Sequence, residues 1–258
     1  MIKYFFSLVS LVLVCTFAVA QTATLKNIET RSSDNKRAFR FPIIELSDAS
    51  AAAEINSDMI EDVIERLVET DMPLVRAMTL KEALLDVAKN SCSNNNCSLT
   101  GLDYKVLYNK NGLLSLRITL ENVQTRIHEK DFYFNYDLKT GNRLELSDVV
   151  RQEQMAALMS HFRQNVSLRN DIIAEKILQH PNFKNDVFAK QKVLACLEKI
   201  AKPILRDFAF TDSGLSLVTD YQSFVDILQA KPKDDFFYDY KLAKFYLNPT
   251  ILQALHIS

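Results

Sequence analysis

The sequence predicts an α+β fold in which an antiparallel sheet of hairpins packs against several helices. Three observations predict it. Between residues 102 and 147, apolar and polar residues alternate with a period of two, as in strands with one buried and one solvated face. Turn residues separate these runs. In residues 50–90 and 149–200, apolar residues instead recur at helical spacing.

The first twenty residues have the three parts of a signal peptide. Lys3 supplies the positive end, residues 4–17 the apolar core, and residues 18–20 (AVA) the small-x-small cleavage site. We therefore expect a secreted or periplasmic protein whose mature chain starts near Gln21. A lipid anchor on Cys15 is the alternative, but a valine precedes that cysteine where lipoprotein signals have a small residue. No later apolar run reaches the about 18 residues that span a bilayer, so we expect no membrane span in the mature chain.

The charge balance gives no sign of a nucleic-acid partner. The whole chain has 31 basic and 32 acidic residues, and removal of the signal peptide takes away only Lys3. Neither a basic field for phosphates nor a polybasic segment for anionic lipid is present. Hydrophobic residues make up 48% of the chain. About 240 mature residues of such a composition can bury one sizeable core or two small ones.

The N-terminal part of the mature chain reads as strand followed by helix. Residues 22–46 have extended character, and Pro42 predicts that the strand containing it is bent or lies at an edge. Ser47 or Asp48 can cap the next element. Residues 51–69 form an amphipathic helical pattern with one apolar face.

A second helical run and a cysteine pair follow. Thr79 and Glu82 have the spacing of a capping box. Cys92 and Cys97 bracket a polar turn, and in an oxidising compartment we expect them to form a disulfide. A zinc half-site is the alternative, but no second Cys or His pair is spaced to complete it. Cys196 lies in an apolar helical run and is expected to be a buried small hydrophobe.

The central stretch contains the clearest strand, residues 114–121, where Leu, Leu, Ile and Leu alternate with Ser, Arg, Thr and Glu. Asn111-Gly112 is expected to join it by a tight turn to a strand at 104–108. A third strand at 132–138 follows. Asp148 can cap a helix that begins just after it.

The C-terminal half again alternates helices and hairpins. Pro181 and Pro203 separate its helical runs. Gly214 is expected to supply a positive φ in the turn of a second hairpin. Asn248 and Pro249 are expected to start a short terminal helix, with Asn as its cap. The expected elements are helices at 149–177 and 186–200, and strands at 204–210, 215–221 and 242–247, which join residues 102–147 in one sheet.

The chain lacks the common catalytic motifs, so we expect no enzyme active site and no cofactor. An envelope hydrolase with an acid pair, or with His161 beside a carboxylate, is kept as an alternative. We expect no metal site, because no histidine pair has ligand spacing. The four histidines are His128, His161, His180 and His256. The candidate acids are Asp131, Asp137 and Asp148, which otherwise read as solvated strand, turn and cap residues.

One segment combines acids with aromatic residues, as partner-binding rims often do. The same alternation also fits aromatic residues that cover a hydrophobic core. We expect it to contribute to ligand binding. Its candidate binding residues are Asp234, Asp235, Phe236, Phe237, Tyr238 and Tyr240.

Three segments carry a family resemblance. They are residues 112–116 (GLLSL), 135–148 (NYDLKTGNRLELSD) and 208–217 (FAFTDSGLSL). Together they resemble the DUF3298 domain of exported bacterial proteins, which include RsiV-type anti-sigma factors and PdaC-type polysaccharide deacetylases. Residues 39–56 (FRFPIIELSDASAAAEIN) resemble the companion DUF4163 segment, in which a proline-containing strand leads into a helix that starts at an Ile-Asn pair.

The resemblance implies a DUF4163-like region at 21–100 and a DUF3298-like region at 101–258, together one compact unit. It implies an accessory role in the cell envelope, because RsiV-type members bind lysozyme and PdaC-type members carry the domain beside a separate catalytic domain. We expect this chain to have neither the anchor of the first nor the deacetylase domain of the second. Residues 221–226 (YQSFVD) also depart from the family's usual turn.

We therefore expect an exported, non-catalytic binding protein whose partner is a protein or a cell-wall glycan. A specific version is an inhibitor or immunity-like protein that blocks a wall-active enzyme such as lysozyme. The alternatives are the envelope hydrolase and a structural envelope component.

Overall fold

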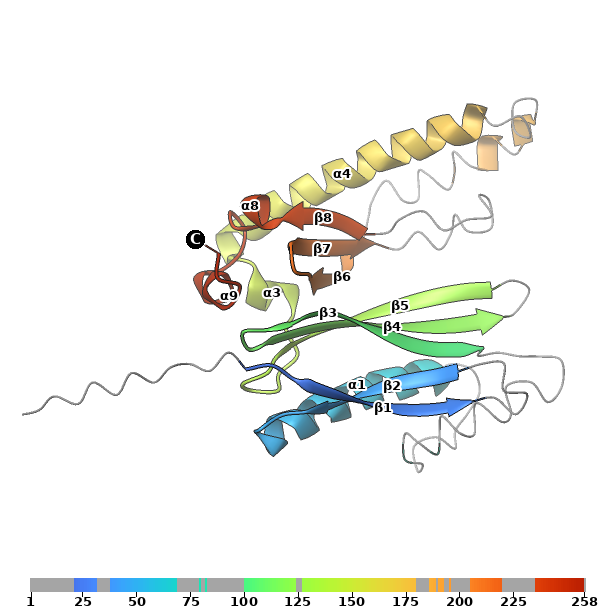
Figure 1. Ribbon diagram of the computed structural model, residues 1–258. Coiled ribbons are helices and arrows are strands. Elements are labelled where there is room, and N and C mark those ends of the chain that lie inside the picture. Colours follow the sequence, from blue (N-terminus) through green and yellow to red (C-terminus); the bar gives the residue numbers. More distant parts are fainter. Residues whose placement is uncertain are drawn as a thin grey trace, which may run out of the picture.

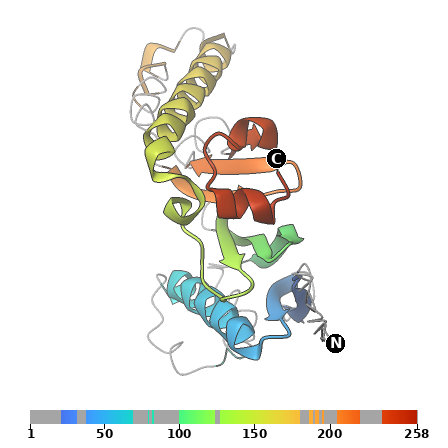
Figure 2. The ribbon, with the colours of Figure 1, turned by 90° about the vertical axis from the view of Figure 1, so that its left-hand side faces the viewer.

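Figure 1 shows a computed structural model of the chain, in which helices and sheets are stacked in layers. Helix α1, a five-stranded sheet, a three-stranded sheet and helix α4 follow one another, and Figure 2 shows α1 and α4 at opposite ends of the molecule. The predicted α+β class is confirmed. The structure describes residues 21–31, 38–68, 79, 82, 100–123, 127–179, 186–188, 190–192, 195, 205–219 and 235–257.

The N-terminal residues are extended and lead into a helix, as predicted, and the structure adds that they form two antiparallel strands. Asp48 is the cap: its Oδ1 accepts hydrogen bonds from the amides of Ser50 (2.9 Å) and Ala51 (3.2 Å). Three elements make up this part: β1 (Thr24–Arg31), β2 (Ala38–Glu45) and α1 (Ala49–Val68).

The Ile55-Asn56 pair lies in the second turn of α1, not at its start as the resemblance implied. Ile55 is fully buried in the core. The Asn56 side chain binds the main chain of β2, because Ile44 N donates to its Oδ1 (2.8 Å) and its Nδ2 donates to Ile44 O (2.9 Å). Pro42 lies on the same edge of β2 and has no N–H to offer a neighbouring strand. Asn56 therefore supplies hydrogen bonds to Ile44 on an edge of β2 where Pro42 disfavours pairing with another strand.

The central stretch forms three antiparallel strands, as predicted. Asn111 (φ 55°) and Gly112 (φ 82°) make the tight turn between the first two. The sheet is nevertheless mixed, because β2 and β3 run parallel, in register at Phe39 and Leu102. The strand order is β1-β2-β3-β4-β5, with β3 at Gly101–Lys110, β4 at Leu113–Val123 and β5 at Ile127–Asp137.

Asp148 does not cap the long helix as predicted. It is the third residue of a short helix, α3 (Leu146–Val149), and its carboxylate accepts from the Glu145 amide (2.8 Å) while the Glu145 carboxylate accepts from the Asp148 amide. This is a capping box. The long helix, α4 (Gln152–Gln179), begins only after it.

Residues after 204 form a separate three-stranded sheet, so the prediction of one sheet from residues 102–147 and 204–247 is wrong. Alternation fixes which face of a strand is buried, but it does not specify which strand is its neighbour. The order is β6-β7-β8, with β6 at Leu205–Phe210, β7 at Gly214–Thr219 and β8 at Asp235–Asp239.

Gly214 is required for a close approach and not, as predicted, for a positive φ. Its φ is not among the positive ones of the described chain, which belong to Asn111, Gly112, Gly141 and His256. A Cβ on Gly214 would lie 2.2 Å from Tyr238 O and 2.6 Å from Cζ of Phe237. Only a residue without a side chain lets β8 and the Phe237 ring lie this close to β7.

The prediction of a strand at 242–247 is also wrong. Residues Tyr240–Ala243 form a helix, α8, whose cap Asp239 accepts from the Leu242 amide (2.9 Å), and only Leu247 makes a single bridge, to Val150. The terminal helix is confirmed. Asn248 caps α9 (Pro249–Ala254) by accepting from the Ile251 amide at 2.9 Å.

The capping box near residue 80 is confirmed as well. Thr79 N donates to Glu82 Oε2 (2.8 Å), and Glu82 N donates back to Thr79 Oγ1 (3.3 Å). The helix expected at 186–200 is described at residues 187–188, 190–192 and 195, which are helical. The signal peptide and Cys196 lie outside the described residues.

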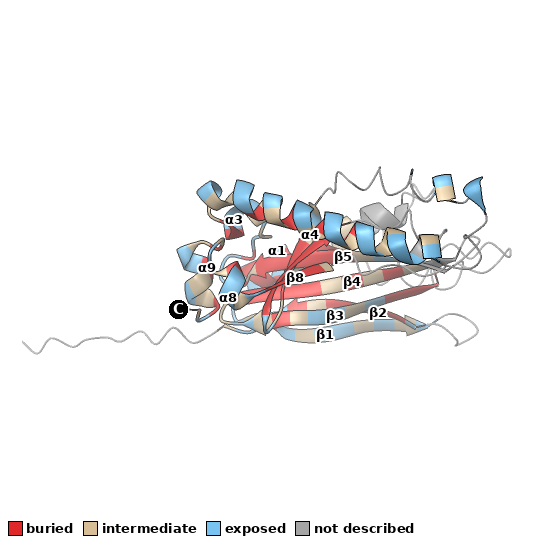
Figure 3. Ribbon diagram, turned by 90° about the horizontal axis from the view of Figure 1, so that it is seen from above, coloured by how far each residue is buried: buried red, intermediate tan, exposed pale blue. Residues whose placement is uncertain are grey.

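Two hydrophobic cores lie on the outer faces of the two sheets. One lies between α1 and the five-stranded sheet, and it includes Met59 and Phe134. The other lies between the three-stranded sheet and α4, and it includes Phe162 and Tyr238. Figure 3 shows the exposed outer side of α4 above buried strands. A third, small apolar cluster joins strands of the two sheets: Tyr133, Ala209 and Val218, with Leu107 packed against them. Buried polar residues, Ser115 and Asn135, also lie on the five-stranded sheet.

Buried polar side chains join the two sheets. Ser115 on β4 donates its hydroxyl to Asn135 Oδ1 (2.7 Å), and Asn135 on β5 donates Nδ2 to Phe208 O (2.7 Å). Phe210 N completes the network by donating to Ser115 Oγ (3.2 Å). Ser115 and Asn135 thus bind Phe210 N and Phe208 O on the outer edge of β6 in place of a neighbouring strand.

We expect Asn135→Ala to destabilise the fold by about 2–4 kcal/mol, because it leaves Phe208 O and the Ser115 hydroxyl buried without this partner. Urea unfolding measures the change. Asn142→Ala is the matched control, since Asn142 is exposed in a turn, and it should change stability by about 0.5 kcal/mol or less. Equal effects of the two substitutions would contradict the role of Asn135.

Candidate binding surface

The structure divides the predicted aromatic segment between a core and a surface. Phe236 and Tyr238 point toward α4 and are 4% and 1% exposed, whereas Phe237 points the other way and is 50% exposed. The Tyr240 hydroxyl donates to Thr211 O (2.7 Å). Asp234 lies outside the described residues. The core interpretation is confirmed for Phe236 and Tyr238, and ligand binding by Phe237 stays a prediction, because alternation along β8 sends successive rings to opposite faces.

Contacts on the α4 side hold β8 in place. The Phe162 and Phe236 rings pack edge to face, with centroids 5.4 Å apart. Asn165 Nδ2 donates to the Tyr238 hydroxyl (3.2 Å). The Arg169 guanidinium lies 3.7 Å from the centroid of the Phe236 ring. Phe237 therefore lies between two residues, Phe236 and Tyr238, that contacts with α4 hold in place.

The outer edge of β8 has open main-chain groups. Tyr240 N donates to Ser213 O (3.2 Å), and in this antiparallel register the bonded positions recur at every second residue, at Tyr238 with Leu215 and at Phe236 with Leu217. The N–H and C=O groups of Asp235, Phe237 and Asp239 therefore point away from β7. Arg169 Nη1 donates to Asp235 O (2.8 Å). No described contact uses Phe237 N–H, Phe237 C=O or Asp239 N–H, so these three groups can pair with an added strand.

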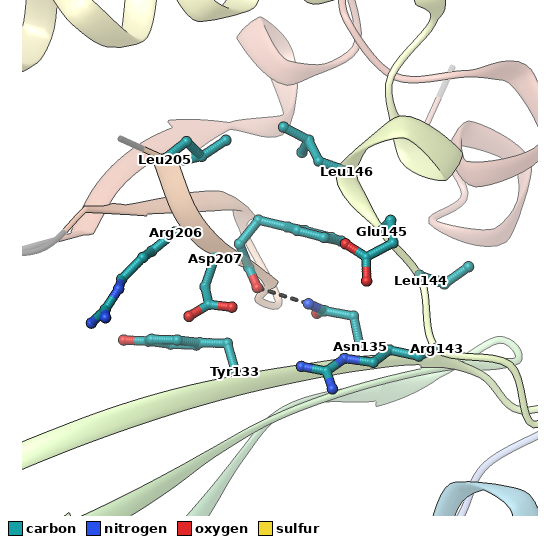
Figure 4. A pocket seen from close by; sticks show the side chains of 10 residues that line it. Tyr133, Asn135, Arg143, Leu144, Glu145, Leu146, Leu205, Arg206 and Asp207 are labelled. Atoms are coloured by element: carbon teal, nitrogen blue, oxygen red, sulfur yellow. Dashed lines mark hydrogen bonds between the residues drawn. The ribbon is translucent and has the colours of Figure 1, made fainter. Parts of the chain in front are cut away.

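A cavity of about 170 Å³ lies between the two sheets (Figure 4). Figure 4 shows Glu145 and Asp207 on opposite sides of this space, with Tyr133 and Asn135 along its floor. The volume holds a handful of waters and lies well below the roughly 300 Å³ at which ligand pockets begin. The lining residues are Tyr133, Asn135, Arg143, Leu144, Glu145, Leu146, Leu205, Arg206, Asp207 and Phe208.

This cavity brings two carboxylates together, which is the arrangement expected of the alternative hydrolase. Glu145, however, already accepts the Asp148 amide in the capping box, and its backbone position is fixed by α3. A catalytic acid or base needs access to a substrate as well as a carboxylate. The cavity is smaller than most ligand pockets, so the geometry favours a structural role for this pair.

A larger groove of about 570 Å³ lies between the β3–β4 turn and α9. Asp137 and Asp148 both line it, but Asp131 lies six residues from Asp137 along β5, or about 20 Å away. The three acids therefore do not form one cluster. Asp137 also accepts from the Lys139 amide (2.8 Å), as expected of a turn residue. The exposed His256 lies at the rim.

His161 lies within the second core. Its Nδ1 is 3.2 Å from the Tyr246 hydroxyl, and its ring packs edge to face against Tyr238 with centroids 5.3 Å apart. Neither described partner is a carboxylate. The side chain of His128 and the whole of His180 are outside the described residues.

Tyr136 belongs to the core between α1 and the five-stranded sheet, and its hydroxyl lies in a charged cluster. Its hydroxyl donates to Asp58 Oδ2 (2.5 Å), and Arg143 Nη1 lies 3.1 Å from Asp62 and 3.6 Å from Asp58. Burial, followed by the Asp58 carboxylate, raises the pKa of Tyr136 well above that of a free tyrosine. The cluster ties α1 to the chain after β5.

Within the described part of the chain, no group of His, Cys, Asp and Glu side chains is arranged to hold a metal ion. Nor does any described helix combine the length and apolarity needed to cross a membrane. Cys92 and Cys97 fall outside the described residues, so their disulfide stays a prediction.

Comparison with known proteins identifies the type of fold. The structure is of the α+β class, with two stacked sheets that are each covered by a helix. A DUF3298 family protein from Pseudomonas aeruginosa PAO1 has a TM-score of 0.50 to this chain at 15% identity, covering 90% of this chain and 96% of its own. A DUF3298 family member from Bacteroides fragilis NCTC 9343 gives 0.47 at 15% identity, covering 91% and 96%. No family model and no curated protein matches the sequence. The chain thus has the DUF3298 fold that its motifs predicted.

Burial predicts how stability responds to alkaline pH. It raises the pKa of Tyr238 from 10.0 to about 12, and it also raises the pKa of Tyr136. Above pH 10 the unfolded chain loses phenolic protons that the folded chain keeps, so the free energy of unfolding should fall as pH rises from 10 towards 12. Urea midpoints across this range measure the effect.

Tyr238→Phe should make this decline shallower, because it removes one of the groups that bind protons differently in the two states. Phe237→Tyr is the control: it adds a half-exposed phenol at a neighbouring position and should leave the slope nearly unchanged. A slope that Tyr238→Phe does not alter would contradict the assignment.

Proposed function

We propose that this protein is an exported, non-catalytic binding protein of the cell envelope. Its ligand is a protein or an envelope glycan. The observation that carries the proposal is the half-exposed Phe237 on a strand whose alternate rings, Phe236 and Tyr238, are buried. A ring held this way loses little conformational entropy on binding, which is typical of aromatic hot spots.

Two further observations support export and an envelope role. The first twenty residues have the composition of a signal peptide, and the cysteine pair at 92 and 97 has the spacing of a local disulfide, which requires an oxidising compartment. The motifs resemble DUF3298 domains, whose RsiV-type members bind lysozyme. The specific version that we favour is an inhibitor or immunity-like protein against a wall-active enzyme such as lysozyme.

An envelope hydrolase is the second candidate, because Glu145 and Asp207 line one cavity. The small volume and the capping role of Glu145 weigh against it. The two candidates differ in a simple measurement. A hydrolase releases soluble products from purified envelope glycan, and Asp207→Asn would stop that release, whereas a binding protein releases none.

The binding proposal is tested by retention on an affinity resin. Mature protein starting at Gln21 is immobilised and exposed to lysozyme and to envelope extracts. We expect a retained partner, and we expect Phe237→Glu to reduce retention about tenfold or more by placing a charge at the contact.

Phe245→Glu is the matched control, since Phe245 is 59% exposed but follows α8 instead of lying on β8. It should change retention by about twofold or less. Absence of any retained lysozyme, envelope protein or glycan would overturn the proposed function.

A further inference from the structure

We infer that the outer edge of β8 binds an extended, basic segment of a partner protein by strand addition. The inference rests on the proposed function and deepens it, because it names both the binding mode and the chemistry of the ligand. It follows from the open main-chain groups of β8, from the charges beside Phe237 and from the contrast with the other sheet edges.

The main chain defines a short docking edge. Phe237 N–H and C=O face outward together, so a partner residue opposite Phe237 can exchange two hydrogen bonds with it. Arg169 already binds Asp235 O, and α8 begins at Tyr240. These two features limit the edge to a few residues. A partner segment must therefore be short and extended in this region.

The side chains define the charge of the partner. Asp235 and Asp239 lie two residues on either side of Phe237 and share its face of the strand. A segment with Lys or Arg at positions i and i+4 and an apolar residue at i+2 would place each cation opposite a carboxylate and its apolar side chain beside the Phe237 ring. The Arg169 guanidinium lies over Phe236 on the other face, and its Nη1 is bound to Asp235 O instead of to the Asp235 carboxylate.

The same charges disfavour a second copy of this chain. Antiparallel pairing of two β8 strands centred on Phe237 would set Asp235 of each copy opposite Asp239 of the other. Parallel pairing would also bring the acids of the two copies close together. Like charges directly opposite one another destabilise a strand pair, so a basic partner is preferred over self-association.

The other sheet edges are partly covered or carry charges of both signs. Ser115 and Asn135 bind the outer edge of β6. The chain after β5 folds back on that strand, because Leu144 N donates to Asn135 O (2.7 Å). The outer strand β1 carries charges of both signs, including Lys26 paired with Glu45 at 2.6 Å, and such charges discourage strand addition. The middle of β8 instead presents an aromatic ring.

The first test uses synthetic peptides and the mature protein. A capped peptide with the core Lys-Thr-Val-Thr-Lys should bind about tenfold more tightly than the charge-reversed Glu-Thr-Val-Thr-Glu at low salt, and the difference should shrink as salt rises. N-methylation of the central valine should abolish binding, because it removes the donor to Phe237 O. Amide NMR should show protection of Phe237 and Asp239 on binding.

The second test uses variants that keep the fold. In Asp235→Asn/Asp239→Asn, the asparagine at 239 can still cap α8, so the variant should fold. Its preference for the lysine peptide over the glutamate peptide should fall to about twofold or less. Asp171→Asn/Glu175→Gln is the control, because it removes two exposed acids from α4 and gives the same change in net charge. It should keep the preference of the unmodified protein.

The outcomes separate the inference from the proposed function. If lysozyme or an envelope component is retained but neither peptide binds, or N-methylation has no effect, the strand-addition inference is wrong and the binding function stands. If a glycan protects Phe237 while the peptides do not, the partner chemistry is wrong. A concentration-dependent dimer that protects Phe237 would establish self-pairing and would also overturn the inference. If nothing binds in any assay, the proposed function fails as well.

Discussion

The arrangement of this protein depends on how the outer edge of β6 is satisfied. Phe208 O and Phe210 N are buried where the two sheets meet, and without a partner each would lose its hydrogen bonds to water and gain none in the protein. Asn135 and Ser115 supply the missing bonds from the five-stranded sheet. Because these bonds are directional, they fix where the three-stranded sheet lies. The buried faces can then pack against α1 and α4 as two separate cores.

Asparagine serves the same purpose at two other places. Asn56 binds both main-chain groups of Ile44, and Asn109 binds both main-chain groups of Ala23 at 2.8 Å each. The carboxamide carries a donor and an acceptor side by side, so it can substitute for one residue of a neighbouring strand. Among the described residues, no such side chain binds the main chain of Phe237 on the outer edge of β8, and this difference supports the proposal that this edge binds a partner.

The binding surface could be found from the sequence only in part. The mixture of acids and aromatic rings in residues 234–240 singled out the stretch that contains the proposed surface, but it did not distinguish the exposed Phe237 from the buried Phe236 and Tyr238. Which ring is exposed depends on which face of β8 lies against α4, and that is set by Phe162 and Arg169 from a helix far away in the sequence. The cavity beside Asn135 was also missed, because it forms only where two sheets meet and no local pattern marks it.

Local physics let the sequence determine the class of fold, the tight turn at Asn111-Gly112, the cap at Asp48 and the capped terminal helix after Asn248, since each depends on residues close together in the chain. Tertiary structure alone decided that the strands divide into two sheets, that β2 and β3 run parallel and that Gly214 allows a close approach. These features depend on contacts between segments distant in sequence. Period-two alternation is the same for every possible neighbour, so the pairing of strands is chosen by burial and by hydrogen bonds such as those of Ser115 and Asn135.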